Sequence, residues 1–354
     1  PSCLSAQLGF GRSYDQGPPV EKQHPFFASL AREESFLSAR RIISEMMPLF
    51  VDIDGNFVEQ FQTGGFDSRL WELYINAYLV EEQLFIERTF NAPDFLVKKY
   101  GETVAIEAVI VGRKKENPVS LFRDPNGPHT PEEIYEAHQD AMPIRFGSPL
   151  FSKLQKKYWE LPHVSGNALV FAIADFHDDQ SMLWSSTALF NYLYGVRHEH
   201  HYDADGQLVI DPIKIEKHQF GNKEIPSGFF YQPNSEHVSA VLFSASGTIS
   251  KFNRLGKQAG FGSPNVRMFR MGTHHDFDPN ASLPKIFKYE VTTETNETWG
   301  EGLSMFHNPN ANHPVPENLF PSIAHHSFDG ERIISRLPEF HPYASHTLNI
   351  RLKE

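Results

Sequence analysis

The spacing of apolar residues predicts several amphipathic helices in the first half of the chain. Apolar side chains recur every three to four positions over residues 26–48, 64–82 and 148–160, which is the period of a helix with one buried face. Thr130 followed by Pro131 and two glutamates is typical of a helix start, because Thr caps the first turn and Pro suits its first position. Residues 113–133, which are polar and rich in proline, predict an exposed loop before that start.

Strands are predicted between these helices. Three apolar stretches follow one another across connections of only two or three residues, which predicts an antiparallel meander. They span residues 83–90, 94–100 and 103–111. Residues 168–176 (ALVFAIADF) are almost continuously apolar, as expected of a central strand buried on both faces.

Elsewhere the pattern is weaker. Residues 51–62 predict a hairpin around Asp54-Gly55, and residues 186–195 predict a helix. Residues 239–245 and 286–293 predict strands able to extend the same sheet. The remaining C-terminal sequence is rich in Asn, Pro and His and is expected to be mostly loop.

The fold class expected from this order is α/β, a mixed central sheet flanked by helices, with a long loop-rich C-terminal elaboration. We expect an N-terminal helical arm and hairpin at 1–62, a core at 63–180, and the elaboration at 181–354 packed on that core. No flexible linker separates the last two segments, so the elaboration is expected to belong to one domain.

Composition narrows the function classes. The 354 residues are 40% hydrophobic, enough for a full core, and no apolar run approaches the roughly 20 residues that span a membrane. Cys3 is the single cysteine, so an intramolecular disulfide is excluded and a reducing cytoplasm is the expected compartment. The net charge of −12 argues against non-specific coating of nucleic acid, although a local basic groove or a metal ion is compatible with it.

The most informative residues are two acids on neighbouring predicted strands. Asp94 opens one strand, and Glu107 lies within the apolar run of the next. A turn near residues 100–102 brings the start of the first strand opposite the later part of the second, so the two carboxylates should lie close together. A carboxylate among Val and Ile is costly unless it is paired or binds a cation. Two adjacent carboxylates are what a Mg²⁺ site requires.

With Pro93-Asp94 at one strand and Glu107-Ala108-Val109 at the next, the chain resembles the PD-(D/E)xK nuclease superfamily, which has a restriction-endonuclease-like fold. The resemblance covers residues 66–176 in the order helix, three strands, helix, strand. The string FVEQFQTGGFDSRLWELYI is also similar to a branch of uncharacterised bacterial proteins assigned to this fold. The superfamily resemblance implies an α-β-β-β-α-β core and a Mg²⁺- or Mn²⁺-dependent nuclease that acts on nucleic acid, with DNA as the expected substrate. A homodimer is compatible with cleavage of both strands.

The resemblance also implies roles for particular residues. Asp94 and Glu107 would hold the metal, the backbone carbonyl of Ala108 would add a ligand, and Glu72 on the preceding helix would face the metal. Val109 stands where the family has its motif lysine. Some members carry that lysine on the following helix.

Two lysines of the predicted helix at 148–160 are candidates for the displaced lysine. Lys153 is favoured, and Lys157, four residues later on the same helix face, is second.

Two other classes of function stay open. A degenerate nuclease fold would bind nucleic acid or a protein partner without cleaving, and Val109 favours it. A His-metal enzyme would use His198, His200 and His201 of the HEHH string, where alternating side chains of a strand share one side. Metal-dependent cleavage separates the first alternative from a nuclease, and retained zinc would support the second.

Overall fold

The computed structural model describes residues 18–53, 55–113, 130–177, 186–244, 246–330 and 332–352. Its α-helices are α2 (Pro25–Arg32), α3 (Leu37–Met46), α4 (Phe57–Gln62), α5 (Phe66–Glu81), α6 (Pro131–Glu136), α7 (Met142–Leu154), α8 (Ser186–Tyr194) and α9 (Ile249–Gln258). Its strands are β1 (Phe85–Glu87), β2 (Phe95–Lys99), β3 (Glu102–Val111), β4 (Ala168–Asp175), β5 (Val196–Tyr202), β6 (Leu208–Lys214), β7 (Lys217–Phe220), β8 (Lys223–Pro226), β9 (Ala240–Ser244), β10 (Val266–His274), β11 (Lys285–Glu290), β12 (Leu303–His307), β13 (Ala324–Phe328), β14 (Ile333–Arg336) and β15 (Pro342–Arg351).

A mixed sheet of eight strands forms the centre of the molecule, in the order β1-β2-β3-β4-β9-β12-β13-β14. Strands β1, β2 and β3 pair antiparallel, as the short connections predict. Strand β4 lies parallel to β3 on one side and to β9 on the other. All eight residues of β4 are buried, which confirms the prediction of a central strand.

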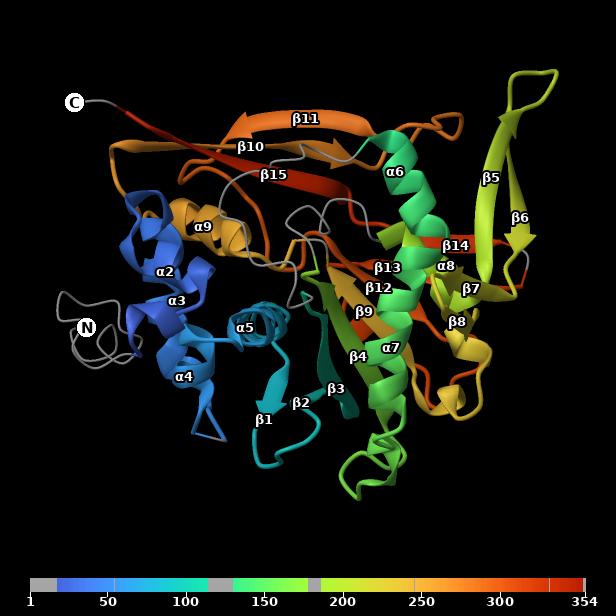
Figure 1. Cartoon of the computed structure of the whole chain (residues 1–354), viewed down its shortest axis with the longest axis horizontal. Coiled ribbons are helices and arrows are strands. Elements are labelled where there is room, and N and C mark those ends of the chain that lie inside the picture. Colours follow the sequence, from blue (N-terminus) through green and yellow to red (C-terminus); the bar gives the residue numbers. More distant parts are fainter. Residues whose placement is uncertain are drawn as a thin grey trace.

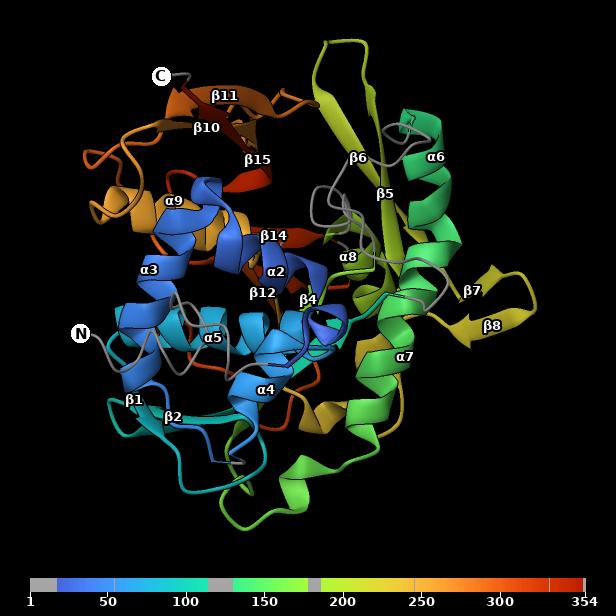
Figure 2. The ribbon, with the colours of Figure 1, turned by 60° about the vertical axis from the view of Figure 1, so that its left-hand side comes forward.

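Helices cover both faces of this sheet (Figures 1 and 2). Helices α2, α3, α4, α5 and α9 pack on one face, where Ile106 of β3 and Val170 of β4 contribute to the core. Helices α7 and α8 pack on the other face, where Val109 of β3 and Phe171 of β4 contribute to a second core. Because side chains alternate along a strand, residues one apart on β3 contribute to different cores.

Three expectations for local structure are wrong. The helix expected at 26–48 is divided into α2 and α3, which residues 33–36 separate. Residues 57–62 form helix α4, not part of a hairpin, because Phe57 and Phe61 lie one helical turn apart and both bury in the α5 core. The helix expected at 148–160 starts at Met142 and ends at Leu154. Thr130 does cap α6, since its Oγ1 atom accepts a hydrogen bond of 3.2 Å from the backbone N–H of Glu133. Most of the loop expected at 113–133 lies outside the described residues.

The C-terminal part is richer in strands than expected. Strands β9, β12, β13 and β14 supply half of the central sheet, so this part is not a loop-rich addition to a finished core. The segment around β11 does not extend the central sheet, because β11 pairs with β10 in a separate three-stranded sheet completed by β15.

Helix α9 lies between this small sheet and the N-terminal helices, as Figure 1 shows. It approaches α3 closely at Gly256, where an added Cβ would lie 2.2 Å from the carbonyl oxygen of Ser38. In the described part of the chain, no helix has the length and apolar character needed to cross a membrane.

Candidate active site at the β2–β3 edge

The antiparallel pairing of β2 with β3 brings Asp94 beside Glu107. The ladder starts at Phe95 opposite Ile106, so Asp94, one residue before the strand, faces the next residue of β3. The amide of Asp94 lies 3.3 Å from Oε2 of Glu107. The Asp94 Oδ2 atom accepts the backbone N–H of Ala108 at 2.7 Å. The proximity expected from the sequence is therefore present.

Glu107 is buried, with 5% of its surface exposed, and its Oε1 atom is held by two side chains. Lys153 near the end of α7 donates its ammonium group to this oxygen. The Tyr158 hydroxyl donates to the same oxygen at 2.7 Å. Glu107 faces the α7 side of the sheet, where Lys153 comes from α7 and Tyr158 from the short 3-10 helix η6 (Tyr158–Glu160) that follows it. The paired lysine and the phenol offset the cost of burying this carboxylate.

Asp94 lies in surroundings that disfavour its charged form. Burial, the Glu107 charge and the Glu72 charge raise the pKa of Asp94 to about 7, and these effects exceed the opposing influence of the Ala108 amide and Lys153. The backbone at this position is fixed by Arg88, which donates to the Asp94 carbonyl at 2.9 Å and to Asn76 at 3.2 Å. Cations also lie around the pair, since Lys153 contacts Glu107 and the Arg88 guanidinium interacts with the charges of Glu72 and Asp94.

Ala108 lies two residues past Ile106, the last residue of β3 that pairs with β2, and its backbone N–H is directed toward the Asp94 carboxylate. In a strand, the N–H and C=O of one residue point to the same edge, so the Ala108 carbonyl is directed toward that side as well. This placement is compatible with the ligand role that the family resemblance implies.

Glu72 on α5 does not join the two acids as a third close ligand. Arg69 binds its carboxylate through two hydrogen bonds of 2.7 and 3.0 Å, one helical turn away. Burial raises the pKa of Glu72 in spite of Arg69, and the Glu107 charge adds to the rise. Glu72 thus acts on the pair through its charge. Among the described residues, one group of three side chains is close enough to share a metal ion, and that group does not include Glu72 or the acid pair.

The structure separates the two candidate lysines. Lys153 contacts Glu107, whereas Lys157 lies past the end of α7 in a left-handed conformation with φ of 51°. The Lys157 ammonium pairs with Glu160 at 3.2 Å on the surface. The expectation that both lysines share a helix face fails because the helix ends at Leu154. Val109 is 3% exposed and packs into the core on the α7 side.

Sequence reasoning missed Tyr158 and Arg88. In one continuous helix, Tyr158 would point about 140° away from Lys153, because five residues cover about one and two-fifths turns. The left-handed Lys157 breaks the helix and turns Tyr158 back toward Glu107. No periodic signal in the sequence marks such a turn, since a non-glycine residue with positive φ is uncommon. Arg88 follows β1 and has no motif around it.

The histidines at 198–201 do not form the metal site that the rival hypothesis requires. They lie on the β5–β6 hairpin, which projects from the molecule in Figure 1. Alternation along β5 sets His198 and His200 on one side and His201 on the other. His201 pairs instead with Asp211 at 3.0 Å on the exposed surface.

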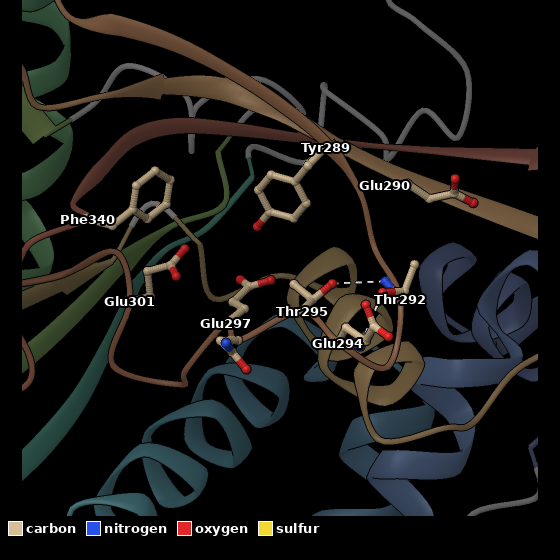
Figure 3. A pocket seen from close by; sticks show the side chains of 9 residues that line it. Tyr289, Glu290, Thr292, Glu294, Thr295, Glu297, Glu301 and Phe340 are labelled. Carbon is tan, nitrogen blue, oxygen red and sulfur yellow. Dashed lines mark hydrogen bonds between the residues drawn. The ribbon is translucent and has the colours of Figure 1, made fainter.

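A pocket of about 440 Å³ lies under the three-stranded sheet of β10, β11 and β15 (Figure 3). Its lining residues lie far from Asp94 and Glu107 in the sequence. Figure 3 shows Glu297, Glu301 and Tyr289 among the side chains that line it. Its deepest acid, Glu297, contacts Arg254 at 2.7 Å and Lys251 at 2.9 Å, and all three are buried. Protein cations already compensate this acid, so we assign the cluster to structure and place the candidate site at Asp94 and Glu107.

Comparison of the chain with protein-family models, with curated proteins and with solved structures finds no match in any of the three. The function is therefore inferred from the chain's own residues. At the β2–β3 edge these are two adjacent carboxylates, one contacting lysine and one buried phenol.

Proposed function

We propose that this chain is a metal-dependent nuclease that hydrolyses phosphodiester bonds in nucleic acid, with DNA as the expected substrate. The observation that carries the proposal is the convergence of Asp94, Glu107 and Lys153 beside the paired strands β2 and β3. The succession α5, β1, β2, β3, α7, β4 supports a restriction-endonuclease-like core, the arrangement that the family resemblance implies.

The donor set at the pair fits Mg²⁺ or Mn²⁺. Asp94 and Glu107 offer carboxylate oxygens and Ala108 a carbonyl oxygen, and hard divalent cations prefer oxygen ligands. Burial, the largest cause, and the acids beside it raise the pKa of Asp94, so a cation bound there would stabilise its charged form. A cation bound there would lower the pKa of a water molecule and stabilise the charge that develops on the phosphate.

The protein's own side chains have distinct tasks in this proposal. Lys153 is 31% exposed, so its ammonium group is able to contact a phosphate oxygen while it stays beside Glu107. Tyr158 holds Glu107 in place and keeps its own proton, since burial and the Glu107 charge raise the phenol's pKa. Arg88 fixes the backbone from which Asp94 projects.

A degenerate fold that binds nucleic acid or a protein partner without cleaving is the second candidate. Val109 favours it, because an apolar, buried residue occupies the position of the motif lysine. The two candidates differ in what Lys153 does. In a nuclease it replaces the missing lysine, whereas in a binding protein it only neutralises Glu107.

A cleavage assay separates them. Supercoiled plasmid and single-stranded DNA are incubated with the full chain in Mg²⁺, Mn²⁺ or EDTA, beside Glu107→Gln. We expect cleavage with either metal, none in EDTA, and a loss of about 100-fold or more in the variant. DNA binding without cleavage in both metals would contradict the nuclease proposal and favour the degenerate fold.

A further inference from the structure

Two histidines and a glutamate converge at a place that the proposed nuclease site does not use. His307 ends β12, His325 lies in β13, and Glu317 begins the short 3-10 helix η10 (Glu317–Leu319). Parallel pairing sets Met305 opposite His325, so His307, two residues further on, projects from the same face of the sheet. One nitrogen from each histidine and one Glu317 oxygen lie within 4.8 Å of one another.

The ring of His325 is oriented as in a metal ligand. Its Nε2 atom lies 2.8 Å from the carbonyl oxygen of Phe320. A carbonyl only accepts hydrogen bonds, so Nε2 carries the proton and the lone pair of the neutral ring lies on Nδ1. Metal-binding histidines are commonly fixed in this way by a carbonyl on the far nitrogen.

The lone pair of His325 is directed at His307. The His325 Nδ1 and His307 Nε2 atoms are 2.8 Å apart. Burial is the main reason why the pKa of both imidazoles is lowered, although the Glu317 carboxylate opposes it at each ring. Without a cation, a proton on His307 bridges the two nitrogens, and Glu317 has no part in that bridge.

Glu317 completes a ligand set. Arg336 of β14 binds one of its carboxylate oxygens at 2.7 Å and so orients the group. The glutamate side chain is 42% exposed, which leaves solvent access beside the two half-buried or buried histidines. Ligands on one tetrahedral zinc lie about 3.3–3.5 Å apart, given bonds of about 2.0–2.2 Å, so the three groups need only small shifts.

We propose that His307, Glu317 and His325 bind Zn²⁺, with water in the fourth position. Two imidazoles and one carboxylate match zinc, whereas Mg²⁺ prefers oxygen ligands alone. The site is separate from the acid pair, because β12 lies three strands from β3, roughly 14 Å along the sheet. It also faces the α5 side, whereas Glu107 faces α7. The bound ion would connect η10 to strands β12 and β13 of the central sheet.

Zinc binding by the full chain tests this proposal. The protein is stripped with EDTA, dialysed free of chelator, and titrated with Zn²⁺ alone, and with Co²⁺ alone to follow its visible d–d absorption. We expect one Zn²⁺ per chain, a rise in melting temperature on loading, and the intense Co²⁺ bands of a tetrahedral site. The variants Glu317→Gln and His307→Gln should each weaken Zn²⁺ binding at least tenfold.

Glu317→Gln keeps the fold testable, because residue 317 lies at the surface and its replacement has nearly the same shape. The matched control replaces the two exposed histidines of β5 (His200→Ala, His201→Ala) and should bind zinc as the wild type does. Wild-type protein that takes up no stoichiometric zinc would overturn the proposal. Binding that survives both site variants, or that is lost in the β5 control, would overturn it as well.

Discussion

Glu107 shows how one residue combines a folding cost with a chemical use. A carboxylate in the run VAIEAVIV would cost several kcal/mol if it were buried alone. Lys153 and Tyr158 remove most of that cost by pairing with one of its oxygens. The sequence predicted Asp94 and Glu107 as neighbours from the short turn between two apolar strands, whereas Lys153 was a candidate only through the family resemblance.

The two lysines give the sharpest contrast at this scale. Lys153→Met should lower the cleavage rate by about 100-fold or more, since it removes the one described lysine in contact with Glu107. Lys157→Asn should cleave at the wild-type rate, because Lys157 pairs with Glu160 and asparagine tolerates its left-handed backbone. Single-turnover rates on plasmid measure both, and equal losses in the two variants would contradict the assignment.

The raised pKa of Asp94 predicts a pH dependence of stability in the metal-free protein. The folded state holds this proton up to about pH 7, whereas the unfolded chain releases it near 4, so stability falls as pH rises through this window. Asp94→Asn mimics the protonated acid. In EDTA, the melting temperature of the variant minus that of the wild type should therefore increase between pH 5 and pH 8. The exposed control Asp205→Asn should show no such increase. A difference that stays constant with pH would refute the electrostatic account of the pair.

At the scale of elements, prediction succeeded where one period dominated and failed where tertiary contacts decided. Helix α5 and strands β2, β3 and β4 lie where periodicity placed them. The segment at 57–62 was misassigned because Asp54-Gly55 is a typical hairpin turn, whereas the burial of two phenylalanines favours a helix. Strand β11 was assigned to the wrong sheet, since sequence gives no information on the partner of an isolated strand.

The buried ion cluster joins α9 to the small sheet and supplies a stability prediction. Arg254 and Lys251 lie on α9, Glu297 follows β11, and Arg270 of β10 lies 3.5 Å from Glu297. Glu297→Gln should lower the free energy of unfolding by about 3–5 kcal/mol at pH 7, because it leaves buried cations without their partner. Glu294→Gln, at an exposed position of the same pocket, should change it by less than about 0.5 kcal/mol. Urea unfolding provides the measurement.

The same cluster predicts acid sensitivity. Burial raises the pKa of Glu297, but Arg254 and Lys251 outweigh it and hold that pKa well below its usual range. Stability from a carboxylate with a depressed pKa is present above about pH 4.5 and is lost as pH falls. The stability gap between wild type and Glu297→Gln should therefore narrow as pH falls below that value. A gap that widens in acid would contradict the cluster's role.

At the scale of the whole molecule, the strand expected at 239–245 joins the central sheet as β9, but most of the C-terminal part could not be placed from the sequence. Its strands complete the central sheet by pairing with residues far away in the chain, and such pairing leaves no local pattern. The overall charge of −12 also matters at this scale, since the chain as a whole repels DNA. A divalent cation at the acid pair would reverse that repulsion locally, so substrate binding and metal binding should be linked.

The central claim is that Asp94 and Glu107 hold the cation that supports cleavage. The most direct measurement is the rate of plasmid cleavage against Mg²⁺ concentration, for wild type and for Asp94→Asn shown to be folded by circular dichroism. We predict a saturable Mg²⁺ dependence in the wild type, and in the variant a loss of at least about 100-fold at every Mg²⁺ concentration. Equal, metal-dependent cleavage by the two proteins would contradict the account.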